Sequence, residues 1–171
     1  MLSRRPAAHE FAPFYAGYIA KVPEGNLLVT LEHGTGELSA YITGVSEARR
    51  SYRYAEGKWS IADTLLHIID TERVMSYRLL RIARGDTTEL PGFEQDDFVA
   101  SAKADSRTLL SLAAEFTGVR SSTMQLVRNL PDDVWDKLGR ASGNGVSARA
   151  LAWIIAGHAI HHLAILKERY R

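Results

Sequence analysis

The run from Leu151 to Leu166 is the sequence feature that most constrains the fold. It is apolar along almost its whole length, and its larger residues recur at steps of three and four, which predicts a helix with one buried face. The same face carries His158 and His162, one helical turn apart and therefore close enough to bind a single metal ion. Burying two unpaired imidazoles in an apolar surface is unfavourable, and a metal ion would satisfy both.

Composition narrows the class of protein. The 171 residues suit one domain with a sizeable core, and the net charge of +1 provides no basic field, so we expect neither a nucleic acid nor a membrane partner. Cysteine is absent, which excludes disulfides, thiolate ligands and a cysteine nucleophile. The first residues carry two arginines without an apolar segment behind them, and no run approaches the length of a membrane span. We therefore expect a cytoplasmic protein.

Periodicity and capping signals predict four long helices. Residues 1–26 are expected to form an arm that packs on the main body and ends in a turn, with Asn26 as the cap of the first helix. Ser60 with Asp63 predicts a near capping box for the second helix, and Ser147 caps the fourth. The helices are expected at residues 27–45, 61–84, 104–129 and from 148 nearly to the C-terminus.

Four such helices with long connections predict an all-α four-helix bundle, with residues 27–171 forming one domain together with the arm. No segment alternates convincingly with period two, and no repeat of 20–50 residues is present, so neither a sheet fold nor a solenoid is favoured. Residues 86–98 are expected to be a loop, and residues 139–146, with three glycines, a flexible connector. Loops of this length permit crossovers along the bundle.

His67 is the best candidate for a third ligand, because it is the only histidine in the middle of another long predicted helix. Bundles build metal sites from facing helices, and catalytic zinc-type sites commonly combine three protein ligands with an open position. His161 points about 100° away from His162, and His9 and His33 lie in less ordered sections, so these are poorer candidates. The alternative is that the histidines are core or surface residues bonded to carbonyls or carboxylates.

Carboxylates near His67 suggest supporting roles. Asp70, three residues later, is the local candidate for the outer-shell hydrogen bond that orients a ligating ring. Glu72, together with nearby arginines, is more simply interpreted as part of a salt-bridged helix surface. No general base is identifiable, and the weak candidates are Glu72, Glu94, Asp96 and Asp97.

Several short motifs together resemble the DinB-like family, from about Phe11 to the C-terminus. They are Tyr54–Ser60, His67–Arg73, Leu90–Phe93, Ser142–Asn144, Ala156–His162 and Leu166–Tyr170. The resemblance implies a four-helix bundle with a down-up-up-down arrangement, often a homodimer. It also implies a divalent metal, commonly zinc or nickel, held by one histidine of the second helix and two of the fourth, here His67, His158 and His162.

These ligands support two kinds of chemistry. All-histidine ligation also suits iron or copper, and manganese is a further candidate. A bound ion would activate water for hydrolysis or a low-molecular-weight thiol for transfer. Because the chain has no cysteine, the thiol would be a cosubstrate. We therefore expect a hydrolase or thiol-dependent transferase acting on a small molecule; the alternative is a non-catalytic metal-binding stress-response protein or a dimeric scaffold.

Overall fold

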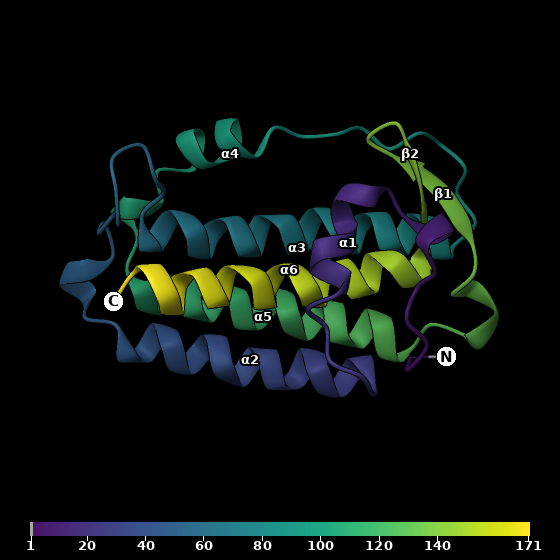
Figure 1. Ribbon diagram of the computed structural model, residues 1–171, viewed down its shortest axis with the longest axis horizontal. Helices are drawn as coiled ribbons and strands as arrows, with labels where there is room; N and C mark the ends of the chain where they lie inside the picture. The colour runs from purple at the N-terminus through teal and green to yellow at the C-terminus, as the bar shows by residue number, and fades with distance from the viewer. Residues whose placement is uncertain (1) are drawn as a thin grey trace.

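The computed structural model describes residues 2–171 and contains four long helices that lie side by side (Figure 1). They are α2 (Leu27–Gly44), α3 (Ile61–Ala83), α5 (Leu109–Arg128) and α6 (Ala148–Arg169). α2 and α6 run in one direction along the bundle, and α3 and α5 run in the other (Figure 1). The prediction of an all-α four-helix bundle with a down-up-up-down order is confirmed.

Side-chain caps fix where the helices begin. The side chains of Asn26, Ser60 and Ser147 each accept a backbone N–H from the first turn of their helix, at 2.9 Å in all three cases. The Asp63 carboxylate in turn accepts the backbone N–H of Ser60 at 3.0 Å, which completes the predicted capping box. Three of the four predicted helix starts therefore agree with the structure.

The third predicted helix is divided in the structure. α5 begins at Leu109 because the Thr108 side chain caps it there, and a separate 3-10 turn covers Ala104–Ser106. A short helix, α4 (Gln95–Ala102), precedes that turn in a segment expected to be mostly loop. The whole connection from α3 to α5 runs back along the length of the bundle (Figure 1).

The expected flexible connector between α5 and α6 is an ordered hairpin. β1 (Leu138–Ala141) pairs antiparallel with β2 (Asn144–Ser147), so this connector is not the flexible segment that was predicted. Ser142 and Gly143 have φ values of 53° and 76°, which make the tight two-residue turn. Glycines at a turn and in short strands leave too few side chains for a period-two pattern.

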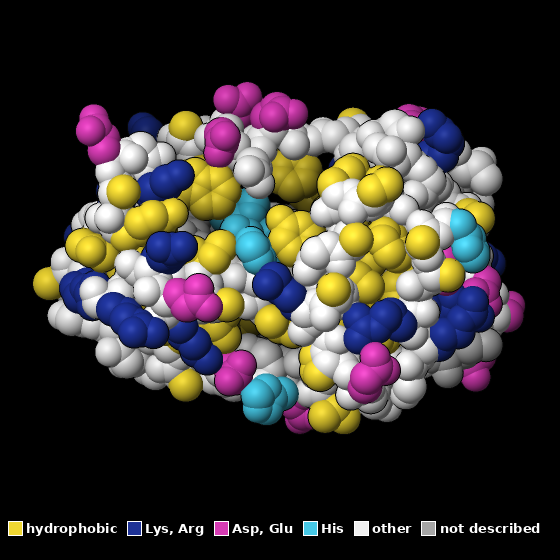
Figure 2. Space-filling view, in the orientation of Figure 1, with side chains coloured by type: hydrophobic (Ala, Val, Ile, Leu, Met, Phe, Trp, Pro, Cys, Tyr) yellow, Lys and Arg dark blue, Asp and Glu magenta, His cyan; other side chains and the backbone are white. Residues whose placement is uncertain are grey.

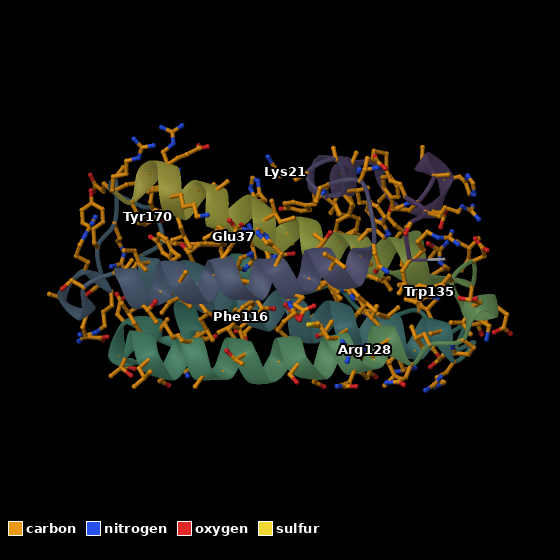
Figure 3. All side chains as sticks on the ribbon, turned by 90° about the horizontal axis from the view of Figure 1, so that it is seen from below. Lys21, Glu37, Phe116, Arg128, Trp135 and Tyr170 are labelled. Carbon is orange, nitrogen blue, oxygen red and sulfur yellow. The ribbon has the colours of Figure 1, made fainter. Side chains whose placement is uncertain are left out.

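The residues ahead of the bundle pack on α6. They include 3-10 turns at Ala8–Glu10 and Pro13–Tyr15 and the one-turn helix α1 (Ala16–Ile19), and Ile19 and Val22 enter the apolar core. Figure 3, seen from below, shows this segment lying on the outer side of α6.

The α6 helix is long and apolar enough to cross a membrane, which differs from the expectation that no segment has that length. Within the bundle, 72% of its most apolar window is buried. Its apolar composition is therefore that of a core helix packed by its neighbours, and it is weak evidence for a membrane span.

The apolar core has two parts along the bundle axis. One part, with Leu31, Leu79 and Leu151, lies toward the end that carries Trp135. The other, with Leu65 and Phe116, lies toward the opposite end, which carries Tyr170; both end residues are labelled in Figure 3. A layer of buried polar side chains separates them, made of Thr71, Glu72, Arg120, Thr123 and the histidines His67, His158 and His162.

Glu72 and Arg120 form an ion pair inside this layer. Their side chains are 2% and 1% exposed, and Nε and Nη2 of Arg120 donate to both carboxylate oxygens at 2.7–3.1 Å. Nη1 of Arg120 also donates to the backbone carbonyl of Leu31 at 3.0 Å. Interpreting Glu72 as part of a salt-bridged surface was wrong, because the pair is interior and joins α3, α5 and α2.

Replacing Arg120 with Met should destabilise the protein by about 3–5 kcal/mol, because it leaves the Glu72 carboxylate buried without a counter-charge. The double variant Glu72→Leu/Arg120→Met removes both charges and should recover most of that loss. Urea denaturation of both variants and the wild type measures the difference. A double variant as unstable as the single one would show that charge compensation is not the role of this pair.

Candidate metal centre

Three histidine side chains converge between α3 and α6. His67 lies near the middle of α3, and His158 and His162 lie one turn apart on the antiparallel neighbour α6. One ring nitrogen from each lies within 4.8 Å of the others, and Nε2 of His67 is 3.0 Å from Nε2 of His158. All three side chains are buried. The structure thus brings together the three residues singled out from the sequence.

The environment of these rings fits a divalent cation. Nδ1 of His162 is buried without a hydrogen-bond partner among residues 2–171, which is unfavourable unless something binds it. The two facing Nε2 atoms of His67 and His158 have only each other as partners within the described chain. Three imidazole donors from two helices are a ligand set typical of zinc and similar transition metals.

Burial also keeps the rings in the protonation state that metal ligation requires. It lowers the pKa of His67 to about 4, against the opposing charge of Asp96. It lowers the pKa of His162 to about 3, with a further lowering from the charges of His67 and His161. The pKa of His158 is also well below its usual value, first because of burial. At neutral pH all three rings are therefore neutral, with lone pairs free to bind a cation.

Aromatic rings hold the imidazoles in place. The Trp59 ring lies with its centroid 4.7 Å from that of His67 and 6.3 Å from that of His162. On the other side, the Tyr18 ring contacts His158 and His161 edge-on at 5.3 and 5.2 Å. His161 stays partly exposed, as predicted from its angle on the helix.

Asp70 does not make the hydrogen bond to His67 that was predicted for it. Its carboxylate accepts from Nη1 of Arg73 at 3.3 Å, and the charges of Glu115 and Arg107 on the α5 side also act on it. Desolvation raises the pKa of Asp70. The reason for the difference is angular, since residues three apart on a helix differ by about 60°, enough for His67 to face α6 while Asp70 faces α5.

Two of the three histidines, His67 and His158, line a pocket of about 370 Å³. Figure 2 shows histidine side chains at the bottom of a hollow in the surface, with hydrophobic side chains around it and acidic side chains along the upper edge. The acidic residues that line the pocket are Glu94 and Asp96, so two of the weak base candidates lie at the site, whereas Glu72 is bound to Arg120. The other lining residues come from α3, α6, the N-terminal segment, the connection between α3 and α5, and the turn between β1 and β2. They are Phe14, Tyr15, Tyr18, His67, Thr71, Met75, Arg78, Phe93, Gln95, Ser142, Ile154 and His158.

Two of the residues that shape this site were missed from the sequence. Arg78 lines the pocket from the same side of α3 as His67 and Thr71. Its spacing from these two residues, at steps that keep it on one side of a helix, was the available signal. Gly157 lets the N-terminal segment approach α6, since a Cβ there would lie 2.1 Å from the backbone oxygen of Tyr18. A close approach between two backbones leaves no periodic pattern.

The protein is therefore a four-helix bundle with a candidate metal site in its interior, formed by three buried histidines from two facing helices. Comparison with known families agrees. Residues 30–166 match the DinB superfamily, and the chain belongs to that superfamily.

Known proteins that are similar to this chain point in the same direction. A curated relative from Oceanobacillus iheyensis, provisionally named as a metal-dependent hydrolase, is 24% identical over 141 residues, covering 82% of this chain and 81% of the relative. Among solved structures, YfiT from Bacillus subtilis, described as a probable metal-dependent hydrolase with an unusual four-helix bundle topology, superposes with a TM-score of 0.74. It is 15% identical, with 85% of this chain and 84% of that chain covered.

A mycothiol-dependent maleylpyruvate isomerase also shares the fold, with a TM-score of 0.67 and 16% identity. The match covers 81% of this chain but only 58% of the isomerase. At these identities the structural likenesses establish the fold alone.

The metal-free protein should lose stability as the pH falls from 6.5 to about 4. In this window the unfolded chain binds protons on histidines whose usual pKa is 6.5, whereas folded His67 and His162 bind them only near 4 and 3. The unfolded state therefore binds more protons, and the free energy of unfolding decreases by roughly 3 kcal/mol for His67 alone. Urea denaturation of chelator-treated protein at pH 7.0, 5.5 and 4.5 measures this, with His67→Gln/His162→Gln as the control, which should reduce the slope of the profile and leave the part that comes from His158. A wild-type profile already flat would contradict the burial of neutral rings.

Gly157→Ala should displace the segment around Tyr18, because the added methyl group overlaps its backbone. We expect a loss of about 2–3 kcal/mol in the free energy of unfolding. Gly118→Ala is the matched control: Gly118 also lies within a long helix, α5, but a Cβ there meets nothing within 4 Å. That variant should gain roughly 0.5–1 kcal/mol from helix propensity. Equal effects of the two substitutions would refute the close approach at Gly157.

Proposed function

We propose that this protein is a metal-dependent enzyme that hydrolyses a small-molecule substrate, with His67, His158 and His162 as the ligands of a divalent ion. The observation that carries the proposal is the convergence of three buried, neutral imidazoles, two of which, those of His67 and His158, line a pocket of about 370 Å³. Three protein ligands next to a pocket leave room for water and substrate, which is the arrangement of catalytic rather than structural zinc-type sites.

The ion would supply Lewis acidity, which lowers the pKa of water or of a thiol. The residues of the chain supply the remaining functions. Trp59 and Tyr18 pack against the imidazoles and keep bulk water away from their outer faces. Glu94 and Asp96 line the pocket, and either carboxylate can accept the proton released when the nucleophile forms.

The names of the relatives support hydrolysis as the leading reaction. The Oceanobacillus iheyensis protein and YfiT are both described as metal-dependent hydrolases, in provisional terms. A second candidate function, thiol-dependent transfer or isomerisation, is favoured by the fold shared with a mycothiol-dependent isomerase. Since this chain has no cysteine, the thiol would be a small cosubstrate that enters the same pocket.

Purified protein should bind one equivalent of zinc or nickel, and His158→Ala should weaken that binding by more than about 100-fold, because it removes one of three ligands. Isothermal titration of chelator-treated protein measures the affinity. His161→Ala is the control, because this neighbouring ring is partly exposed and outside the cluster. Equal affinities of His158→Ala and the wild type would remove the metal assignment.

Turnover distinguishes the candidate functions. The metal-loaded wild type is compared with His158→Ala on a panel of ester and amide substrates, and on electrophilic substrates with and without a low-molecular-weight thiol. Metal-dependent hydrolysis without thiol supports the leading proposal, and activity only with thiol supports the second. A stoichiometric ion without any turnover would identify a non-catalytic metal-binding protein.

A further inference from the structure

Three arginine side chains of the described chain are almost completely buried: Arg78 at 2%, Arg120 at 1% and Arg149 at 1% exposed. Two of them are neutralised, Arg120 by Glu72 at 2.7 Å and Arg149 by Glu10 at 2.9 Å. Arg78 has no carboxylate within 4.0 Å among residues 2–171; its hydrogen bonds go to neutral groups. A buried guanidinium without a counter-charge is unfavourable, so the position of Arg78 calls for an anion.

The neutral contacts of Arg78 leave donors unused. Nη2 donates to the carbonyl of Pro91 at 2.7 Å and to Oγ of Ser142 at 3.0 Å, while Nη1 reaches only the sulfur of Met75 at 3.8 Å. A guanidinium has five N–H donors in a planar fork, and a thioether is a weak acceptor. The N–H groups of Nη1 and Nε therefore have no charged acceptor among residues 2–171; their surroundings are the Tyr15 hydroxyl and the Phe93 ring, whose centroid lies 5.9 Å from Cζ. They can donate to one oxygen of an anion that enters the pocket, and such a charge-assisted hydrogen bond is stronger than a neutral one.

Arg78 lines the same pocket as the histidines. On α3, the lining residues His67, Thr71, Met75 and Arg78 follow one face over three turns, so the ends are separated by about 16 Å of helix rise. The long Arg78 side chain leans toward the N-terminus of α3, where Nη1 reaches the sulfur of Met75. Met75 and, across from it, Ile154 of α6 form an apolar middle section between these two polar ends.

We propose that Arg78 is the anion-binding end of the pocket and that the substrate is a small molecule carrying one carboxylate, separated by an apolar section from the group that reacts at the histidines. A single charge is specified because one guanidinium is available, and because the carboxylates of Glu94 and Asp96 on the same pocket disfavour further negative charge. Placing the reacting group at the histidines rests on the proposed function, whereas the carboxylate site at Arg78 stands without it.

The experiment compares binding of hexanoate with that of hexanamide, which has the same size without the charge. Titration calorimetry is performed on chelator-treated full-length protein, so that a carboxylate cannot bind through a metal ion. The wild type should bind hexanoate roughly 10- to 100-fold more tightly than hexanamide, and Arg78→Met should abolish this preference. Hexyl phosphate is a third ligand, and tighter binding of this dianion would overturn the carboxylate assignment.

Controls separate this inference from a structural role of Arg78 and from the metal proposal. Arg84→Met removes an exposed charge from the end of α3 and should keep the preference for hexanoate. Arg78→Lys keeps the charge but not the fork, so it should retain the fold with a reduced preference. Equal binding of hexanoate and hexanamide to the wild type overturns the proposal even if Arg78→Met does not fold. His158→Ala should keep the preference whether or not the protein uses a metal.

Discussion

The stability of the bundle depends on hydrogen-bond partners for the polar side chains that are buried halfway along its length. Two apolar core regions pack the ends, and between them lie three imidazoles and the Glu72–Arg120 pair, all within the interior. The ion pair finds its hydrogen-bond partners within the protein. The Glu72 carboxylate accepts hydrogen bonds from two nitrogens of Arg120, and the third nitrogen donates to the Leu31 carbonyl. The histidines lack such partners in the part of the chain that the structure describes, where a buried nitrogen of His162 has no hydrogen bond. In this polar layer the ion pair has its hydrogen-bond partners within the protein, whereas the histidines lack them and adjoin a pocket. A structural polar core has all its groups paired, so this layer has the character of a binding site.

How much of this was predictable from the sequence depends on whether the interaction is local. Helix periodicity and caps such as Ser60 and Ser147 act within one turn, so α2, α3 and α6 were predicted within one residue at most ends. His67, His158 and His162 were found because two of them share a helix face and the third lies in the middle of another long helix. The Glu72–Arg120 pair joins residues 48 positions apart, and neither residue carries a local sign of burial. A hydrogen bond from His67 to Asp70 was predicted because the two residues are close in sequence. The direction in which the Asp70 side chain points depends instead on which neighbouring helix packs against its side of α3.

The missed hairpin has a different cause. Its pairing depends on the turn at Ser142 and Gly143 and on contacts with distant segments, such as the hydrogen bonds between Leu90 and the backbone of β1 and the turn that follows it. Gly139 allows this hairpin to lie on α3, where a Cβ would come within 2.5 Å of Ile82. Glycine was interpreted as a sign of flexibility, whereas at Gly139, as at Gly157, it permits close packing. Composition does not distinguish these two uses of glycine, because the difference lies in what is packed against it.

The location of the pocket follows from the order of the helices. α3 and α5 are parallel, so the chain must return along the bundle between them, and residues 84–108 make that return across the outer side of α3. This places Phe93, Glu94 and Asp96 over the side of α3 that carries His67. The N-terminal segment covers the adjacent side of α6 through the contact at Gly157. An up-down-up-down bundle would have short connections only at its ends, and its midplane histidines would be either sealed inside or open to bulk water. The parallel pair is therefore the reason why the polar layer at mid-length adjoins a pocket: α3 and α6 form one part of its wall, and segments outside the four helices form the rest.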